Sequence, residues 1–253
     1  FPTLDALTAY MYNRTRSSDC LGPSCIAEPS GKGGSGKPTH SIAIVAMGCR
    51  FPRACDSPEV WFQGMLDKQD WVGTIDRWDP DQYEGYIRHA ALLNALPQNT
   101  SNPIDPQHVL LLEITRELVQ APGFILPEKT AVMIGCSADD WGSTRTREGK
   151  STNGYDALAP NRISSEFNLT GPNLLVKQGC ASGMLCVHMA RQSLLTGEAN
   201  AALCGGVNVI LDPVYNDLVA NQRLVARDGR HKSFDATADG FVRSEGCGIV
   251  VLK

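Results

Sequence analysis

The residue with the clearest potential for chemistry is Cys180, in the tract KQGCASGM at residues 177–184. An extended apolar run at 173–176 precedes the tract, and a stretch with helical spacing from 184 to 195 follows it. A cysteine between a strand and a helix lies at the positive end of the helix dipole, where a thiolate is favoured. Its neighbours are glycine, alanine and serine, which leave the sulfur open. The pattern predicts a nucleophilic cysteine, and the alternative is a buried, inert one.

Short motifs occur in a fixed order around this tract. They are IAIVAMGCRFP (42–52), RWD (77–79), DPQ (105–107), NRIS (161–164), LTGP (169–172), CAS (180–182), GGVN (205–208), KSFDA (232–236) and DGFVRSEG (239–246). In order and spacing they resemble the β-ketoacyl synthase (ketosynthase) family, and most closely the ketosynthase domains of modular type I polyketide synthases. The resemblance runs from about Ser41 to Lys253. It places Cys180 at the family's acyl-accepting cysteine, which is therefore the candidate catalytic residue.

The resemblance implies an acyltransferase of the condensing type. A ketosynthase moves an acyl group from an acyl carrier protein thioester onto its cysteine, then decarboxylates a malonyl-type unit and joins the two in a Claisen condensation. The implied partners are acyl carrier protein, acyl and malonyl-type thioesters, and a second copy of the domain in a homodimer. Phosphopantetheine arrives on the carrier protein, so no directly bound cofactor and no metal are expected. The second step uses two histidines from the C-terminal half of the domain, so this chain alone is expected to be inactive in condensation.

Strands alternate with helices along the chain, which indicates an α/β fold. Apolar runs predict strands at 42–47, 131–135, 201–209 and 248–252. Helices are predicted at 60–66 and, after the DPQ motif, at 109–119, and residues 48–58 are predicted to form a loop. The resemblance narrows the fold to the N-terminal half of a thiolase-like fold, a mixed sheet with flanking helices.

Three regions are expected. Residues 1–14 have the spacing of a short amphipathic helix and resemble the last helix of an acyl carrier protein, and a linker helix packed on the ketosynthase is the alternative. Residues 15–39 have no period and contain the run GKGGSGKP, which predicts a flexible linker. The glycine spacing in this run is not that of a P-loop. Residues 40–253 form the ketosynthase N-terminal half.

The composition favours a cytoplasmic enzyme. The chain has 253 residues and a net charge of −4, which gives no reason to expect a nucleic acid as partner. No signal peptide is visible, and no apolar run approaches the ~18 residues that span a bilayer. Nine cysteines, an odd number spread through periodic segments, predict reduced thiols. The cysteines nearest the N-terminus, together with His40, lack the spacing of a zinc site.

Two residues near the nucleophile need separate hypotheses. Lys177 stands where the family motif usually has aspartate, and its ammonium favours a thiolate if it lies close to Cys180. If the strand continues through this position, alternation sends Lys177 to the opposite face. His188, eight residues after Cys180, is predicted to be a core or interface histidine rather than a catalytic one.

Two other functions stay open at the level of sequence. One is a ketosynthase-like module that binds carrier proteins without elongating chains. The other is a cysteine hydrolase or acyltransferase that uses Cys180 with a local histidine.

Overall fold

The computed structural model describes residues 41–78, 87–97, 104–121, 123–137, 140–150, 156–222 and 224–253. The predicted helix at 1–14 and the predicted linker at 15–39 lie outside these ranges. Residues 41–231 and 239–253 form the larger of two units, and residues 232–238 belong to the smaller one. In the smaller unit, Asp235 accepts hydrogen bonds from the N–H and the hydroxyl of Thr237. The sheet and the helices belong to the larger unit.

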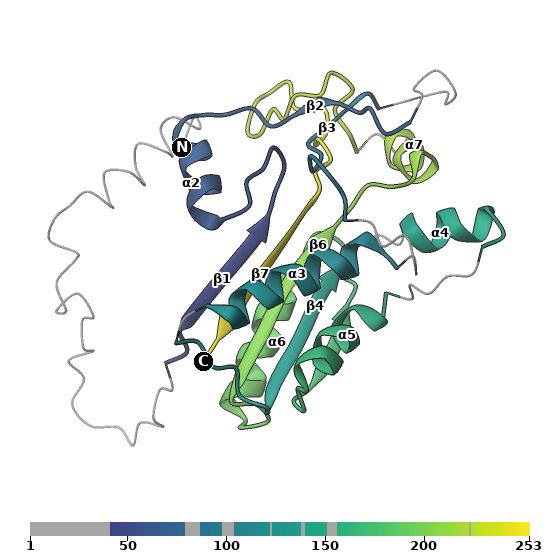
Figure 1. Cartoon of the computed structure of the whole chain (residues 1–253). Helices are drawn as coiled ribbons and strands as arrows, with labels where there is room; N and C mark the ends of the chain where they lie inside the picture. Colours follow the sequence, from purple (N-terminus) through teal and green to yellow (C-terminus); the bar gives the residue numbers. More distant parts are fainter. Residues whose placement is uncertain are drawn as a thin grey trace, which may run out of the picture. The chain divides into compact units, whose positions relative to one another are not determined.

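Among the described residues, a five-stranded mixed sheet forms the centre of the larger unit (Figure 1). Its strands are β1 (Ile44–Arg50), β4 (Thr130–Cys136), β5 (Asn173–Val176), β6 (Ala201–Asn208) and β7 (Gly246–Leu252). Their spatial order is β1-β7-β6-β4-β5. β4 runs parallel to β5 and β6, whereas β7 runs antiparallel to β6 and β1. The short strands β2 (Gly73–Thr74) and β3 (His89–Ala90) pair separately.

Helices cover both faces of this sheet. α3 (Pro106–Gln120) and α5 (Leu158–Phe167) pack on one face and on each other, and α6 (Ser182–Leu195) packs on the other face. Figure 1 shows α3 crossing in front of the strands and α6 behind them. The other described helices are α2 (Pro58–Leu66), α4 (Asp140–Arg147) and α7 (Pro213–Asn221). In these ranges, no helix is both long enough and apolar enough to cross a membrane.

β4 explains why the central strands have continuous apolar sequences. Every residue of this strand is buried. Val132 and Ile134 face the cluster built with α3 and α5, while Ala131 and Met133 face the cluster built with α6. A strand covered on both faces needs apolar side chains at all positions, not only at alternate ones.

The start of α3 follows from the DPQ motif. Asp105 accepts a hydrogen bond from the N–H of Gln107 at 2.8 Å, which satisfies one of the amides left over at the helix start. Pro106 is the first helical residue, where a missing N–H costs nothing. The predicted apolar face is buried at Leu110, Leu111, Ile114 and Leu118. The prediction for this helix is confirmed.

Most predicted elements are confirmed, with one error and five omissions. The first strand is shifted toward the C-terminus, and the prediction of a loop beginning at Gly48 is wrong, because Gly48, Cys49 and Arg50 pair with β7. The sequence analysis did not predict the two-residue strands β2 and β3 or the helices α4, α5 and α7. α4 and α7 are short and carry few apolar residues on a defined face, so their patterns are weak. α5 contains a proline at position 160, within its first turn, where a helix tolerates it.

Candidate active site

Cys180 lies in a tight turn between β5 and α6. The strand ends at Val176 and the helix begins at Ser182. Gly179 has φ 53°, a left-handed conformation that costs glycine little. The hydroxyl of Ser182 accepts a hydrogen bond from the N–H of Gln178 at 2.8 Å and donates to the carbonyl of Gly179 at 2.7 Å. These short-range bonds hold the turn closed and leave Cys180 on its outer side.

The environment of Cys180 differs from that of the other described cysteines. Its residue is exposed, whereas Cys49, Cys55, Cys136, Cys186, Cys204 and Cys247 are buried. Burial raises the pKa of Cys49 and Cys186 to about 11, and that of Cys204 to about 12. These buried thiols therefore stay protonated near neutral pH and have little access to reagents. The predicted buried, inert alternative does not apply to Cys180.

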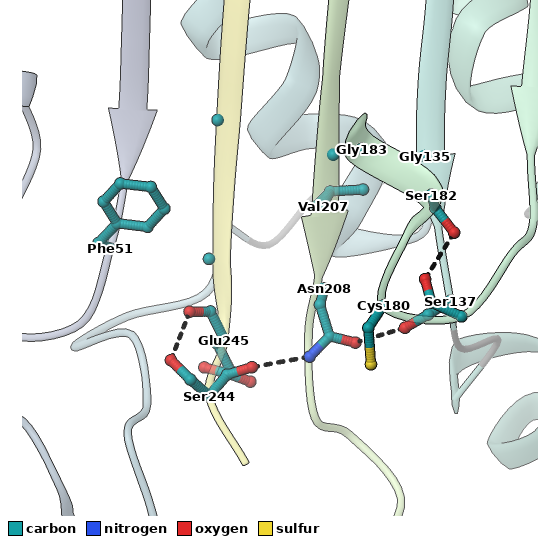
Figure 2. A pocket seen from close by; sticks show the side chains of 14 residues that line it. Phe51, Gly135, Ser137, Cys180, Ser182, Gly183, Val207, Asn208, Ser244 and Glu245 are labelled. Carbon is teal, nitrogen blue, oxygen red and sulfur yellow. Dashed lines mark hydrogen bonds between the residues drawn. The ribbon is translucent and has the colours of Figure 1, made fainter. Parts of the chain in front are cut away.

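Cys180 lines a cavity of about 290 Å³ at the end of the sheet. Ser137, Asn208 and Ser244 contribute polar groups to the wall, and Phe51 contributes an aromatic ring. Figure 2 shows Ser137 and Asn208 on the side of Cys180, with Ser244 hydrogen-bonded to the Asn208 amide. Glycines make up much of the remaining wall, so a substrate can approach the backbone closely.

Gly135 allows α6 to start beside the end of β4. A Cβ atom at this position would lie 2.7 Å from the carbonyl carbon of Ser182 and 2.8 Å from the nitrogen of Gly183. Both of these atoms belong to the helix backbone, which cannot move aside as a side chain can. Glycine at 135 is therefore what brings the N-terminus of α6, and with it Cys180, onto the sheet.

Asn208, the last residue of β6, connects two walls of the cavity (Figure 2). Its side-chain N–H donates to the carbonyl of Ser244 at 2.8 Å. Its side-chain oxygen accepts from the hydroxyl of Ser137 at 3.5 Å, the long end of hydrogen bonding. The amide thus spans from the start of β7 to the end of β4, on the same cavity as Cys180.

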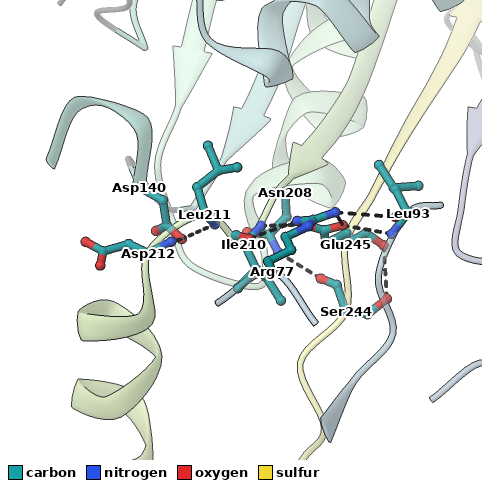
Figure 3. Close-up of polar contacts among 9 residues, drawn as sticks. All are labelled: Arg77, Leu93, Asp140, Asn208, Ile210, Leu211, Asp212, Ser244 and Glu245. Atoms are coloured by element: carbon teal, nitrogen blue, oxygen red, sulfur yellow. Dashed lines mark hydrogen bonds and ion pairs between the residues drawn. The ribbon is translucent and has the colours of Figure 1, made fainter. Parts of the chain in front are cut away.

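Glu245 lines the opposite side of the cavity, and behind the lining it forms an ion pair with Arg77 (Figure 3). The Glu245 side chain has no exposed surface, and its carboxylate accepts from the N–H of Leu93 at 2.8 Å and of Ile210 at 2.7 Å. Arg77 also donates to the carbonyls of Ile210 at 2.9 Å and Leu93 at 3.3 Å. These four residues, named the Glu245 cluster below, join four segments far apart in the sequence.

The loop after β6 is also held from its other side. Asp140 accepts hydrogen bonds from the N–H of Leu211 at 3.0 Å and of Asp212 at 3.2 Å (Figure 3). Burial raises the pKa of Asp140, although these amides and the charge of Arg243 oppose the shift. Asp212 pairs with Arg147 at 2.6 Å. The loop that follows Asn208 is therefore held by two buried carboxylates, Glu245 at Ile210 and Asp140 at Leu211 and Asp212.

The structure decides where Lys177 and His188 lie. The Lys177 ammonium forms an ion pair with Asp156, a buried carboxylate near the start of α5. His188 is exposed on α6, so the prediction of a core histidine is wrong, and its interface role stays a prediction. His108, in contrast, is buried, and Arg162 donates to its Nδ1 at 3.2 Å.

Sequence reasoning missed roles for Ser137, Asn208, Glu245 and Arg77, although three of these residues stand in quoted motifs. Ser137 and Asn208 stand at the ends of apolar strands, and Glu245 stands directly before one. A polar residue at such a position marks a strand end that faces a site. That signal identifies candidates, but it does not say that Arg77 meets Glu245 across 168 positions.

The family comparison covers most of the chain. The model of the β-ketoacyl synthase N-terminal domain matches residues 39–253. A highly reducing polyketide synthase from Cladosporium cladosporioides is 31% identical over 87% of this chain and 11% of its own length. The 6-methylsalicylic acid synthase from Aspergillus niger is 30% identical over 84% of this chain and 14% of its own length. The chain thus spans a small part of the curated relatives it matches.

Solved structures agree with the sequence comparison. The oxazolomycin ketosynthase domain from Streptomyces albus has a TM-score of 0.75 and 26% identity, covering 84% of this chain and 42% of that chain. The module 6 ketosynthase of the bacillaene synthase from Bacillus subtilis has a TM-score of 0.74 and 29% identity, with coverages of 84% and 40%. The predicted family and the thiolase-like fold are confirmed. The chain belongs to the β-ketoacyl synthase family, in which it matches the N-terminal domain of the ketosynthases of polyketide synthases.

Proposed function

We propose that this chain provides the acyl-accepting part of a polyketide synthase ketosynthase, with Cys180 as the nucleophile. The observation that carries the proposal is the exposed thiol of Cys180 on the cavity at the start of α6, in a chain of this family. The substrate is an acyl thioester, and it arrives on the phosphopantetheine arm of an acyl carrier protein. No directly bound cofactor takes part.

The acylation step needs one nucleophile and one place for negative charge. The Cys180 thiolate attacks the thioester carbonyl carbon, a new C–S bond forms, and the carbonyl oxygen takes up negative charge. When the carbonyl re-forms, the bond to the pantetheine sulfur breaks and the pantetheine thiolate leaves with the electron pair. The N-terminal amides of α6, with the N–H of Cys180, supply the charge stabilisation in this proposal. The product is an acyl group held on Cys180.

Condensation requires groups from the C-terminal half of a ketosynthase domain. There, decarboxylation of a malonyl-type unit gives a carbanion that attacks the acyl group on Cys180 and frees the thiol. The matched N-terminal domain supplies the acyl-cysteine for this step and the sheet end that faces it. We accordingly propose that the chain by itself acylates but does not condense.

We also propose a homodimer and a cytoplasmic setting. β5 lies at the end of the described sheet, and Leu174 on this strand is 40% exposed. An apolar edge strand favours pairing with a second copy, because its unpaired backbone groups and apolar surface are then covered. Reduced thiols throughout the described chain fit a reducing compartment.

The two alternative functions gain no support from the comparisons. A cysteine hydrolase needs a general base beside the thiol, yet no histidine is among the described residues that line the Cys180 cavity. A non-elongating module that only binds carrier proteins gives no reason for an exposed thiol at a helix start. The described cavity lining, which has no histidine, and the exposed Cys180 thiol therefore both favour acyl transfer over these two functions.

Incubation with an acyl-pantetheine thioester tests the proposal. We expect one acyl group per chain, located at Cys180 by peptide mass spectrometry, and none in the Cys180→Ala variant. Stable acylation with little release of free acid supports a ketosynthase. Steady turnover to free acid would instead support a hydrolase, and acylation spread over other cysteines would contradict the role of Cys180.

A further inference from the structure

We propose that Lys177 is a positioning residue for Cys180, and that it acts through its ion pair with Asp156. This inference rests on the proposed function, since it assigns a role in bringing Cys180 to the acyl thioester. The pair joins the turn that carries the nucleophile to the start of α5. In this proposal the Lys177 charge acts through Asp156 rather than directly on the sulfur.

Lys177 offers the turn an anchor at its N-terminal end, opposite the end that α6 holds at Ser182. β5 pairs with β4 on one side, and its last paired residue is Val176, opposite Gly135. Lys177 is the first residue beyond this pairing. The hydrogen bonds of the following turn, in the described part of the chain, run among residues 178–182 and so fix its shape more than its place.

Asp156 offers a firm attachment point for the ammonium. Its residue is 8% exposed, and its backbone carbonyl accepts from the N–H of Ala159 at 2.9 Å, in the first turn of α5. A carboxylate at this end of a helix is stabilised by the dipole. α5 packs against α3, β4 and β5, so its start is tied to the body of the sheet. The ion pair therefore ties Lys177 to the start of α5 and so to the body of the sheet.

The same geometry gives a reason for lysine in place of the family's usual aspartate. An aspartate at 177 would bring a second carboxylate to the buried Asp156, and like charges at such a distance repel strongly. Lysine instead neutralises Asp156, and the paired charges cancel much of each other's field at Cys180. Removal of both side-chain charges should therefore lower the rate of Cys180 acylation at every pH and leave the midpoint of the rate–pH profile unchanged, because the net field at Cys180 stays nearly the same.

A double-mutant cycle on the full chain tests this inference, with acetyl-pantetheine as the acyl donor. We expect Lys177→Gln and Asp156→Asn each to slow Cys180 acylation by about tenfold, because small displacements of reacting groups carry large rate penalties. The double variant should lose about as much as either single variant, since both remove one interaction. Lys177→Arg should stay within about threefold of the wild type, because it keeps the charge and the reach.

Arg116→Gln is the matched control, because it removes an exposed ion pair between α3 and Glu166 on α5. Its acylation rate should equal that of the wild type. Multiplicative losses in the double variant, unchanged rates in Lys177→Gln, or a shifted midpoint at an unchanged limiting rate in the double variant would each overturn the positioning role. If the wild type itself is not acylated at Cys180, the proposed function fails. If the wild type is acylated and the variants match it, only this inference fails.

Discussion

The two walls of the Cys180 cavity are built in opposite ways. On one side, the turn that carries Cys180 is closed by hydrogen bonds among residues 178–182, and glycine supplies its left-handed conformation. On the other side, the Glu245 cluster joins residues as far apart as Arg77 and Glu245 through a buried ion pair and backbone hydrogen bonds. One wall is local and partly exposed, and the other is long-range and buried.

The two sides of the cavity therefore have different roles in this account: the turn presents the Cys180 thiol, and the Glu245 cluster stabilises the fold. The Cys180 thiol, the nucleophile in our proposal, is exposed in a turn held by a few neighbouring residues. The opposing wall carries buried charges, whose partners must all be present for the fold to tolerate them. Substitutions in the Glu245 cluster should therefore act on stability, while those in the turn should act mainly on reactivity at Cys180.

The largest effect is expected from Glu245→Ala. It leaves Arg77, whose side chain is 18% exposed, without its carboxylate, and leaves the amides of Leu93 and Ile210 without an acceptor. Loss of one partner of a buried pair typically costs about 3–5 kcal/mol. Denaturant unfolding followed by circular dichroism measures this loss.

Glu166→Ala is the comparison for that experiment, because Glu166 pairs with Arg116 at the surface. Its effect on the free energy of unfolding should stay below about 1 kcal/mol. If both variants lose the same free energy of unfolding, the distinction between the buried Glu245 cluster and an exposed ion pair does not hold.

The same contrast explains what the sequence predicts and what it leaves out. The nucleophile turn is visible because Gly179, Cys180 and the following helix are contiguous, and α3 is visible because Asp105 and Pro106 mark its start. The continuous apolar run of β4 is visible for the same reason. Each of these signals lies within a window of about one element.

A sequence window of one element does not reveal the Glu245 cluster or the Lys177–Asp156 pair. Arg77, Glu245 and Asp156 carry ordinary charges in the sequence, and only the sheet order brings them to their partners. The core option predicted for His188 fails for a related reason, because helical spacing does not say which face of α6 is covered. These features depend on contacts between residues far apart in the sequence.

Gly135→Ala should have the next largest effect, and it should act on both stability and reactivity. The added methyl lies under 3 Å from the backbone of Ser182 and Gly183, so the start of α6 must shift. Overpacking of this kind costs about 1–3 kcal/mol. Cys180 alkylation should slow as well, because the turn moves with the helix. Gly183→Ala, where a Cβ atom meets nothing within 4 Å, is the control and should change neither quantity by much.

A smaller effect concerns the buried thiols on the α6 face of the sheet. Burial raises the pKa of Cys186 from 9.0 to about 11, so the folded state keeps a proton that the unfolded state releases above about pH 9. Folding stability should then fall as pH rises from about 9 to about 11, by up to about 1.4 kcal/mol per pH unit for this thiol. Urea unfolding across this range should show a shallower fall in Cys186→Ala. Parallel curves for variant and wild type would contradict the predicted linkage.

The smallest effect is expected from Ser182→Ala. The variant removes two hydrogen bonds that close the nucleophile turn, those to Gln178 and Gly179. We expect a loss of about 1 kcal/mol in the free energy of unfolding, as for other helix-start hydroxyls. Thermal unfolding measures it. A loss as large as that of Glu245→Ala would mean that the turn carries as much of the fold as the opposing wall.

The most direct test of the account is the rate at which a thiol-reactive acyl mimic modifies each cysteine of the folded chain. Cys180 is exposed, whereas Cys136, Cys186 and Cys204 are buried and must wait for local opening of the fold. Site-resolved mass spectrometry at about pH 7.5 should show Cys180 labelled at least about tenfold faster than these three, a gap that disappears in urea. Equal labelling of Cys180 and the buried cysteines in the folded chain would contradict the exposed nucleophile turn and the function proposed for it.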